Sequence, residues 1–309
     1  MTPRMLIVLS ENWTMTSGRD LPRLVRWAQE AEDAGFDAVM VSEHVVLGPD
    51  AAEHGVMANP RDYALPGNQD PATPWPSSLP LLSAIAAATR RVRLVAGAVL
   101  APLRHPLLLA KELATLDLLS EGRLVVLPSV SWSRDEYAAL GVPFGKRGRL
   151  LDEHLEVWQQ AWGPSPASYE GAHYRFADVY CEPKPHRPGG PPLWFGGATV
   201  HDRLLARLVR YGKGFNPLGR PSPQDLRRLT DGLTAAGRSI DELELVGGTR
   251  AVFPDDHSPA DLGRALDTIP AQQAEGFTTF CVKPSQFTDD PDAVGAFCAD
   301  VMRRVSVFG

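Results

Sequence analysis

Cysteine, basic charge and long hydrophobic runs are all scarce in this sequence. The three cysteines, Cys181, Cys281 and Cys298, are odd in number and lack metal-ligand spacing, which favours reduced thiols over a disulfide framework. Lys and Arg total 31 against 37 Asp and Glu, giving a net charge of −6, so a nucleic-acid partner is not expected. The apolar stretch Met5–Leu9 is too short for a signal-peptide core or a membrane span. We therefore expect a cytoplasmic protein with no membrane partner.

Several chemical motifs are missing as well. The sequence contains no G-x-S-x-G nucleophile elbow, and no glycine-rich dinucleotide fingerprint follows the first apolar run, Met5–Ser10. The histidines that do not cluster with carboxylates at ligand spacing are His54, His173, His186, His201 and His257. We therefore expect no metal site.

What the chain does have is a regular alternation of short apolar runs and longer amphipathic stretches, eight times over its 309 residues. The expected strands are Met5–Ser10, Phe36–Ser42, Val92–Ala98, Leu124–Val130, Leu193–Phe195, Lys213–Phe215, Leu243–Val246 and Phe277–Val282. The expected helices are Asp20–Gly35, Leu79–Thr89, Pro106–Leu119, Gly148–Trp162, Val200–Arg210, Ser222–Ala236, Pro259–Gln273 and Pro291–Val305. Continuous apolar strands, each followed by a helix, indicate a parallel sheet covered by helices. Eight such units favour closure, and we predict one α/β domain over residues 1–309, a (β/α)₈ TIM barrel, rather than an open doubly wound sheet.

Two stretches interrupt this rhythm. Residues 45–78 contain six prolines and no helical period, and a loop this long after a strand usually serves a site. We predict that it is a lid over the active site; a surface insertion without function is the alternative. Residues 163–191 contain a hairpin pattern at Tyr169–Tyr174, to which we assign a packing or dimerisation role.

Four segments of the chain carry a distinctive pattern: residues 34–44 (AGFDAVMVSEH), 89–94 (TRRVRL), 102–124 (PLRHP through LSEGRL) and 183–197 (PKP through PPLWFGG). Together they resemble the luciferase-like family of flavin and deazaflavin oxidoreductases. The similarity is strongest between Gly35 and Gly197, and the nearest branch is the one that uses 8-hydroxy-5-deazaflavin, coenzyme F420. The segment Leu127–Trp132 departs from that branch, which usually has glycines after the fourth strand. Serine and proline would crowd a cofactor that approaches the backbone there.

Active sites of (β/α)₈ barrels lie at the C-terminal ends of the strands. His44 follows the second strand, and an imidazole can exchange a proton beside a hydride transfer. The resemblance implies a histidine against the cofactor ring at this position; the alternative is a rim histidine that is hydrogen-bonded for structure. Glu43 is the second catalytic candidate, and it either orients His44 or points into the barrel, where a buried carboxylate needs a partner.

Small and polar residues at the other strand ends are predicted to hold the cofactor. Gly196 and Gly197 precede a helix, so their amides are placed to hold a phosphate. The complete predicted cofactor set is Ser42, Gly97, Ala98, Ser129, Ser131, Gly196, Gly197, Ala198, Thr199 and Asn216. The predicted substrate contacts are Glu11, Trp13, Tyr63 and Trp75.

The resemblance implies an F420-dependent oxidoreductase that transfers a hydride between the reduced deazaflavin and a small organic substrate. An FMN-dependent luciferase-like monooxygenase is the first alternative. A barrel that has lost its cofactor and its activity is the second, motivated by Ser129 and Ser131. A homodimer is expected on resemblance alone.

Overall fold

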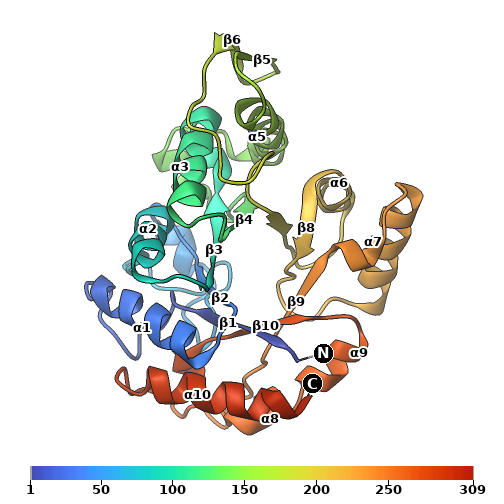
Figure 1. Cartoon of the computed structure of the whole chain (residues 1–309). Helices are drawn as coiled ribbons and strands as arrows, with labels where there is room; N and C mark the ends of the chain where they lie inside the picture. Colours follow the sequence, from blue (N-terminus) through green and yellow to red (C-terminus); the bar gives the residue numbers. More distant parts are fainter. Residues whose placement is uncertain (1, 309) are drawn as a thin grey trace.

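Apolar runs of three to eight residues form the barrel strands. The computed structural model describes residues 2–308 and contains a closed barrel of eight parallel strands (Figure 1). In order around the barrel these are β1 (Arg4–Val8), β2 (Ala38–Val41), β3 (Arg93–Leu100), β4 (Leu124–Ser129), β7 (Leu193–Phe195), β8 (Gly212–Phe215), β9 (Glu244–Gly248) and β10 (Thr279–Val282). Pairing of β1 with β10 completes the ring. The predicted (β/α)₈ barrel is confirmed.

The helices surround the barrel largely where the sequence predicts them. They are α1 (Leu21–Ala34), α2 (Ser78–Ala88), α3 (Pro106–Leu119), α4 (Arg134–Ala139), α5 (Arg147–Trp162), α6 (Asp202–Tyr211), α7 (Pro223–Ala235), α8 (Leu262–Leu266), α9 (Ile269–Ala274) and α10 (Val294–Val305). The single helix expected over Pro259–Gln273 is wrong, because it is two helices. Pro270 lies in the first turn of α9, where proline fits because that N–H has no helical partner. The short helix α4 was not predicted.

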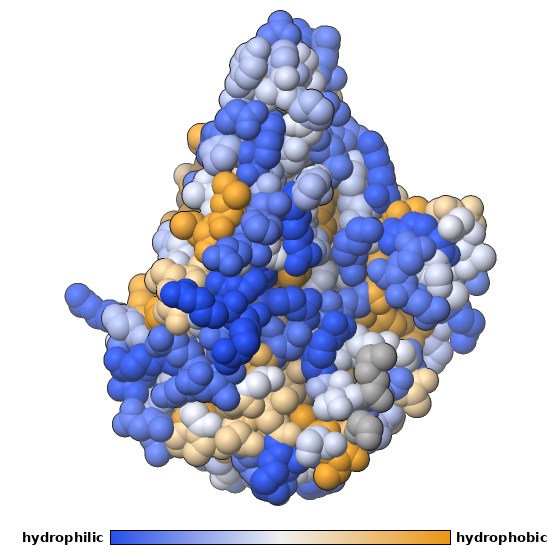
Figure 2. Space-filling view, viewed as in Figure 1, coloured by the Kyte–Doolittle hydropathy of each residue, from blue (hydrophilic) through white to orange (hydrophobic). Residues whose placement is uncertain are grey.

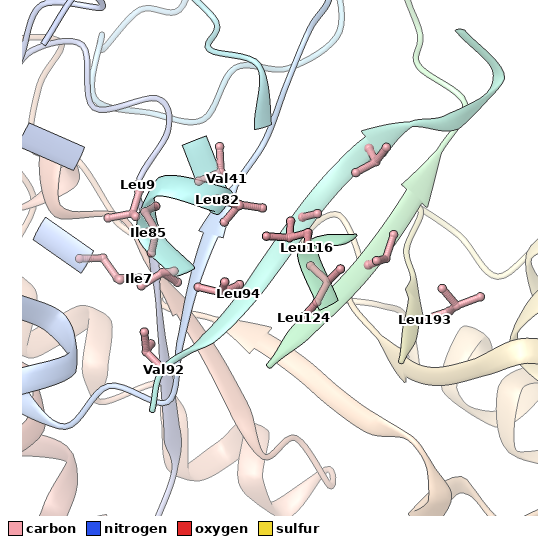
Figure 3. Packing of buried hydrophobic residues seen from close by; sticks show 14 of the residues in the cluster. Ile7, Leu9, Val41, Leu82, Ile85, Val92, Leu94, Leu116, Leu124 and Leu193 are labelled. Atoms are coloured by element: carbon pink, nitrogen blue, oxygen red, sulfur yellow. The ribbon is translucent and has the colours of Figure 1, made fainter. Parts of the chain in front are cut away.

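Alternation along the strands creates two apolar layers. Residues such as Ile7, Leu94 and Leu124 face outward and pack against Leu82, Ile85 and Leu116 of the helices (Figure 3). The inward-facing side chains form a second cluster inside the barrel: Leu6, Val8, Ala38, Met40, Val95, Val125, Trp194 and Val246. The barrel is therefore filled rather than hollow.

Charged residues close the N-terminal end of the barrel. Arg93, the first residue of β3, forms ion pairs with Asp37 and with Glu244, the latter at 2.8 Å, and lies over the Trp194 ring at 5.5 Å. Burial alone would lower the pKa of Arg93, but the two carboxylates outweigh it and raise the pKa. This ion cluster occupies the N-terminal end of the barrel, whereas active sites of such barrels lie at the opposite, C-terminal end.

The predicted hairpin lies outside the barrel. Strands β5 (Ala167–Glu170) and β6 (Arg175–Val179) pair antiparallel and project beyond α5 (Figure 1). Hydrogen bonds from Tyr169 to Glu156 (2.8 Å) and between His173 and Glu153 (2.5 Å) fasten the hairpin to α5. Its role in dimerisation stays a prediction. Hydrophilic residues predominate on the molecular face in Figure 2, and no helix within residues 2–308 is long and apolar enough to cross a membrane.

Candidate active site

His44 lies at the C-terminal end of the barrel, three residues after β2. Its Nδ1 lies 3.3 Å from Oε2 of Glu136. The rings of Trp75 and Trp132 contact the imidazole edge to face, with centroids at 5.1 and 5.4 Å. Nε2 has no hydrogen-bond partner within residues 2–308. The imidazole is thus held through one nitrogen, and the other nitrogen is available to a ligand.

Glu136 is the carboxylate that holds this histidine in place. It lies on α4 with no exposed surface. It accepts hydrogen bonds from the Ser131 hydroxyl at 2.7 Å and from the backbone N–H of Val45 at 2.6 Å. Burial would raise the pKa of Glu136, but the hydrogen bonds from His44 and Ser131 outweigh it and lower the pKa. Glu136 is therefore an ionised acceptor for the Nδ1 proton, which leaves Nε2 without a proton and able to accept a hydrogen bond.

The Glu43 side chain points away from His44 and accepts hydrogen bonds from other residues. Its carboxylate receives two hydrogen bonds from Arg104, at 2.7 and 3.1 Å, and one each from the Ser78 hydroxyl (2.5 Å) and the Leu100 N–H (3.1 Å). These bonds join the ends of β2 and β3 to the start of α2. The carboxylate in contact with His44 is Glu136 rather than Glu43.

The segment 45–78 lies over the β1, β2 and β10 side of the barrel mouth. The Tyr63 ring packs against the interior apolar cluster. The Ala64 N–H donates to Oε2 of Glu11 at 3.1 Å. The Trp75 ring lies 5.2 Å from that of Trp13. All four predicted substrate contacts therefore lie together at the mouth, and the function of the segment as a lid stays a prediction.

The opposite rim, formed by β3, β4, β7 and β8, is more open. Ala98, Ser129 and Asn216 are half-buried at the ends of their strands, and Ala198 and Thr199 are exposed. The Gly97–Ala98 peptide bond is cis, and the register between β3 and β4 shifts there. This rim carries most of the predicted cofactor residues.

Gly196 and Gly197, the two glycines after β7, have different roles in the structure. A Cβ on Gly196 would lie 2.0 Å from the carbonyl oxygen of Asn216, so only glycine permits this approach of β7 to β8. Beyond it, the backbone N–H groups of Gly197, Ala198 and Thr199 have no acceptor in the described part of the chain. Consecutive free N–H groups ahead of a helix are suited to a phosphate.

Two of the predicted cofactor residues lie apart from this rim. The Ser42 hydroxyl is 2.9 Å from that of Ser10 and 3.4 Å from Glu11, on the side that segment 45–78 covers. Ser131 has a positive φ of 53° and directs its hydroxyl to Glu136. Its hydroxyl therefore supports the histidine.

Sequence reasoning assigned no role to three residues of the mouth. Glu136 and Trp132 contact His44, and Lys283, the residue after β10, is fully buried beside Tyr63. The pattern Ser133-x-x-Glu136 is a helix-start signal that would have revealed α4, and Ser133 does accept a hydrogen bond from the Glu136 N–H at 3.1 Å. Within residues 2–308 no group of three or more His, Cys, Asp or Glu side chains is placed to hold a metal ion.

A filled barrel with a histidine–carboxylate pair at its C-terminal mouth has the architecture of a (β/α)₈ enzyme. The model of the luciferase-like monooxygenase family matches residues 4–276, and the chain belongs to this family. Family members are oxidoreductases and monooxygenases that depend on flavin or F420, and the chain is an enzyme of this kind.

The individual relatives include both an F420-dependent and an FMNH₂-dependent enzyme. An uncharacterised protein of Mycobacterium tuberculosis is 34% identical over 216 residues, which cover 68% of this chain and 73% of the relative. The F420-dependent glucose-6-phosphate dehydrogenase of Microbacterium testaceum is 26% identical over 74% of this chain and 64% of its own length. The FMNH₂-dependent dimethylsulfone monooxygenase of Pseudomonas putida is 31% identical over 43% of this chain and 37% of its own length.

A similar solved structure supports the fold. The monooxygenase RslO1 from Streptomyces bottropensis superimposes with a TM-score of 0.72 at 22% identity, covering 99% of this chain and 98% of that one.

Proposed function

We propose that the protein is an F420-dependent oxidoreductase that transfers a hydride between the deazaflavin and a small organic substrate. The observation that carries this proposal is His44, which Glu136 holds through Nδ1 while Nε2 is available at the barrel mouth. A two-electron reduction needs one proton exchanged beside the hydride, and a positioned imidazole supplies it. The dehydrogenase relative, matched over 74% of the chain against 43% for the FMNH₂-dependent one, favours F420.

The rim formed by β3, β4, β7 and β8 has hydrogen-bond donors for such a cofactor. Ala98 and Ser129 are half-buried and Ala198 and Thr199 are exposed at the strand ends, where a planar ring would lie, and the free N–H groups of residues 197–199 would hold a phosphate. When bound, the deazaflavin supplies or takes up the hydride. His44 donates or accepts the proton at Nε2, while Trp75 and Trp132 exclude water from the imidazole.

An FMN-dependent monooxygenase fed by a separate reductase is the second candidate, and the dimethylsulfone monooxygenase relative favours it. Purified protein should be titrated with F420 and with FMN, in oxidised and reduced forms, and the affinities compared. We expect F420 to bind at least about tenfold more tightly, which corresponds to about 1.4 kcal/mol. Tighter binding of FMN would replace the proposal with the monooxygenase, and binding of neither at micromolar concentration would support the inactive barrel.

A further inference from the structure

Lys283 is a buried cation whose hydrogen-bonding capacity is largely unused. It has no exposed surface, and its Nζ donates one hydrogen bond, of 2.6 Å, to the backbone carbonyl of Asp62. The Tyr63 and Trp13 ring centroids lie 4.9 and 5.8 Å from Nζ. An ammonium group has three N–H donors, so two of them lack a hydrogen-bond acceptor within residues 2–308. Burial of unsatisfied donors is costly unless they have a use.

More unsatisfied polar groups follow directly in the chain. The Ser285 hydroxyl and the Gln286 side-chain oxygen are buried without a hydrogen-bond partner in the described residues. The Ser285 N–H donates to the Asn12 side chain at 2.9 Å, which holds this turn against the loop after β1. The β1–β10 edge of the mouth therefore contains buried hydrogen-bond donors and acceptors that have no partner within the described residues.

A short piece of segment 45–78 covers this edge, and we name residues 62–64 the strap. Its Asp62 carbonyl accepts from Lys283, and its Ala64 N–H donates to Glu11. The strap is irregular backbone, and the Asp62 side chain is exposed. It thus offers a neutral acceptor to a buried cation and a donor to a buried carboxylate. An anionic oxygen in place of the neutral carbonyl would form a stronger hydrogen bond with Nζ, because donor and acceptor would then carry opposite charges.

We propose that Lys283 binds an anionic group of the substrate, a carboxylate or a phosphate, and that the strap occupies this place until the substrate displaces it. Glu11, released from Ala64, then accepts a hydrogen bond from a hydroxyl or amine of the same molecule. That the ligand is the substrate rests on the proposed function; that the site binds anions does not.

The test measures binding of inorganic phosphate and of acetate by titration calorimetry, in wild type and in Lys283→Met, Lys283→Arg and Tyr63→Ala variants. Removal of the Tyr63 ring frees the strap from the barrel interior, so Tyr63→Ala should bind the anion more tightly than wild type. Lys283→Met keeps the apolar stem and should lose at least about tenfold in affinity, the magnitude of a charged hydrogen bond. Lys283→Arg should retain binding. Whichever anion binds more tightly identifies the group as phosphate or carboxylate.

The pH dependence of binding gives a second readout. Burial lowers the pKa of Lys283 to about 8, against the opposing effect of Glu11 and Asp62, the charged groups that face it. Anion affinity should therefore decrease as the pH rises through about 8, and Lys283→Arg should lack this decrease. Lys213→Met, at an exposed lysine of β8, is the matched control and should bind as wild type does.

Two outcomes would overturn the proposal. One is that neither anion binds wild type or Tyr63→Ala; the other is that Lys283→Met binds as tightly as wild type. In either case Lys283 only fastens the strap. Titration of the same variants with F420 separates failure of this proposal from failure of the proposed function. If wild type does not bind F420, the proposed function fails, whereas anion binding at Lys283 is measured independently of F420.

Discussion

Glu136→Gln should move the proton of His44 from one ring nitrogen to the other. The amide has the size of the carboxylate and keeps one oxygen for the Val45 N–H, 2.6 Å away. Its NH₂ group then faces Ser131 and Nδ1 of His44, where wild type has an acceptor at 2.7 and 3.3 Å respectively. Nδ1 must accept instead of donate, and the imidazole proton moves to Nε2. General acid–base catalysis contributes about 10²- to 10⁴-fold, and we expect turnover to fall by about 10²-fold or more.

The same substitution has a cost in stability with a defined pH dependence. Hydrogen bonds to a charged group contribute about 1.5–3 kcal/mol, so the free energy of unfolding at neutral pH should fall by about 2 kcal/mol. The folded-state pKa of Glu136 lies below its ordinary value of 4.5. Its stabilisation is therefore present above that value and is lost as the pH falls through the lower, folded pKa. The stability gap between wild type and variant should narrow in acid.

Two measurements test this reasoning. Nitrogen-15 NMR of the imidazole reports which nitrogen carries the proton and needs no substrate. Urea unfolding at neutral and at acidic pH gives the stability gap. If His44 keeps its proton on Nδ1 in the variant, or if the gap is the same at both pH values, Glu136 does not set the state of His44.

Three further substitutions separate chemistry from packing. His44→Ala should lower turnover by about 10²- to 10⁴-fold while F420 affinity changes by less than about tenfold; near-normal turnover in a folded, cofactor-loaded variant would refute the role of His44 as proton donor. Glu43→Gln leaves Arg104 without its charged partner and should lower the free energy of unfolding, measured in urea, by about 3 kcal/mol. The folded variant should retain its affinity for F420. A variant of normal stability that has lost turnover would instead make Glu43 a catalytic residue. Gly196→Ala should destabilise by about 1–3 kcal/mol, because the new Cβ lies 2.0 Å from the carbonyl oxygen of Asn216. In the control Gly197→Ala the nearest atom is a flexible leucine methyl at 3.2 Å, and equal melting temperatures of the two variants would contradict this explanation.

The strands and most helices follow from local patterns. Asp20 caps α1 and accepts from the Arg23 N–H, as its position before an apolar helical period indicates. Gly35 ends the same helix in the left-handed conformation, with φ 96°. Even the strand β7, three residues long, could be predicted because it belongs to a repeating βα unit.

The candidate site could be predicted only in part, because its decisive contacts join distant residues. Glu136 is 92 positions from His44 and lies on a helix of six residues that has too few turns to show a period. Sequence adjacency alone leaves open whether Glu43 orients His44 or points into the barrel towards another partner. Adjacent side chains in extended backbone point to opposite faces, and Glu43 accordingly reaches Arg104 instead.

The start of segment 45–78 both accepts hydrogen bonds from the first residues of α4 and donates hydrogen bonds to them. The Asp50 carboxylate accepts from the Ser133 hydroxyl at 2.9 Å, and the Asp50 N–H donates to Asp135 at 2.8 Å. A Cβ on Gly48 would lie 2.4 Å from that of Asp135, so the chain passes this helix closely. Since Glu136 also contacts His44 and the Val45 N–H, the first six residues of the segment and the histidine are attached to the same short helix. If the segment opens as the predicted lid, we expect it to bend beyond Asp50, and we expect an exchange of residues 51–77 between relatives to alter the choice of substrate while leaving the contact between His44 and Glu136 in place.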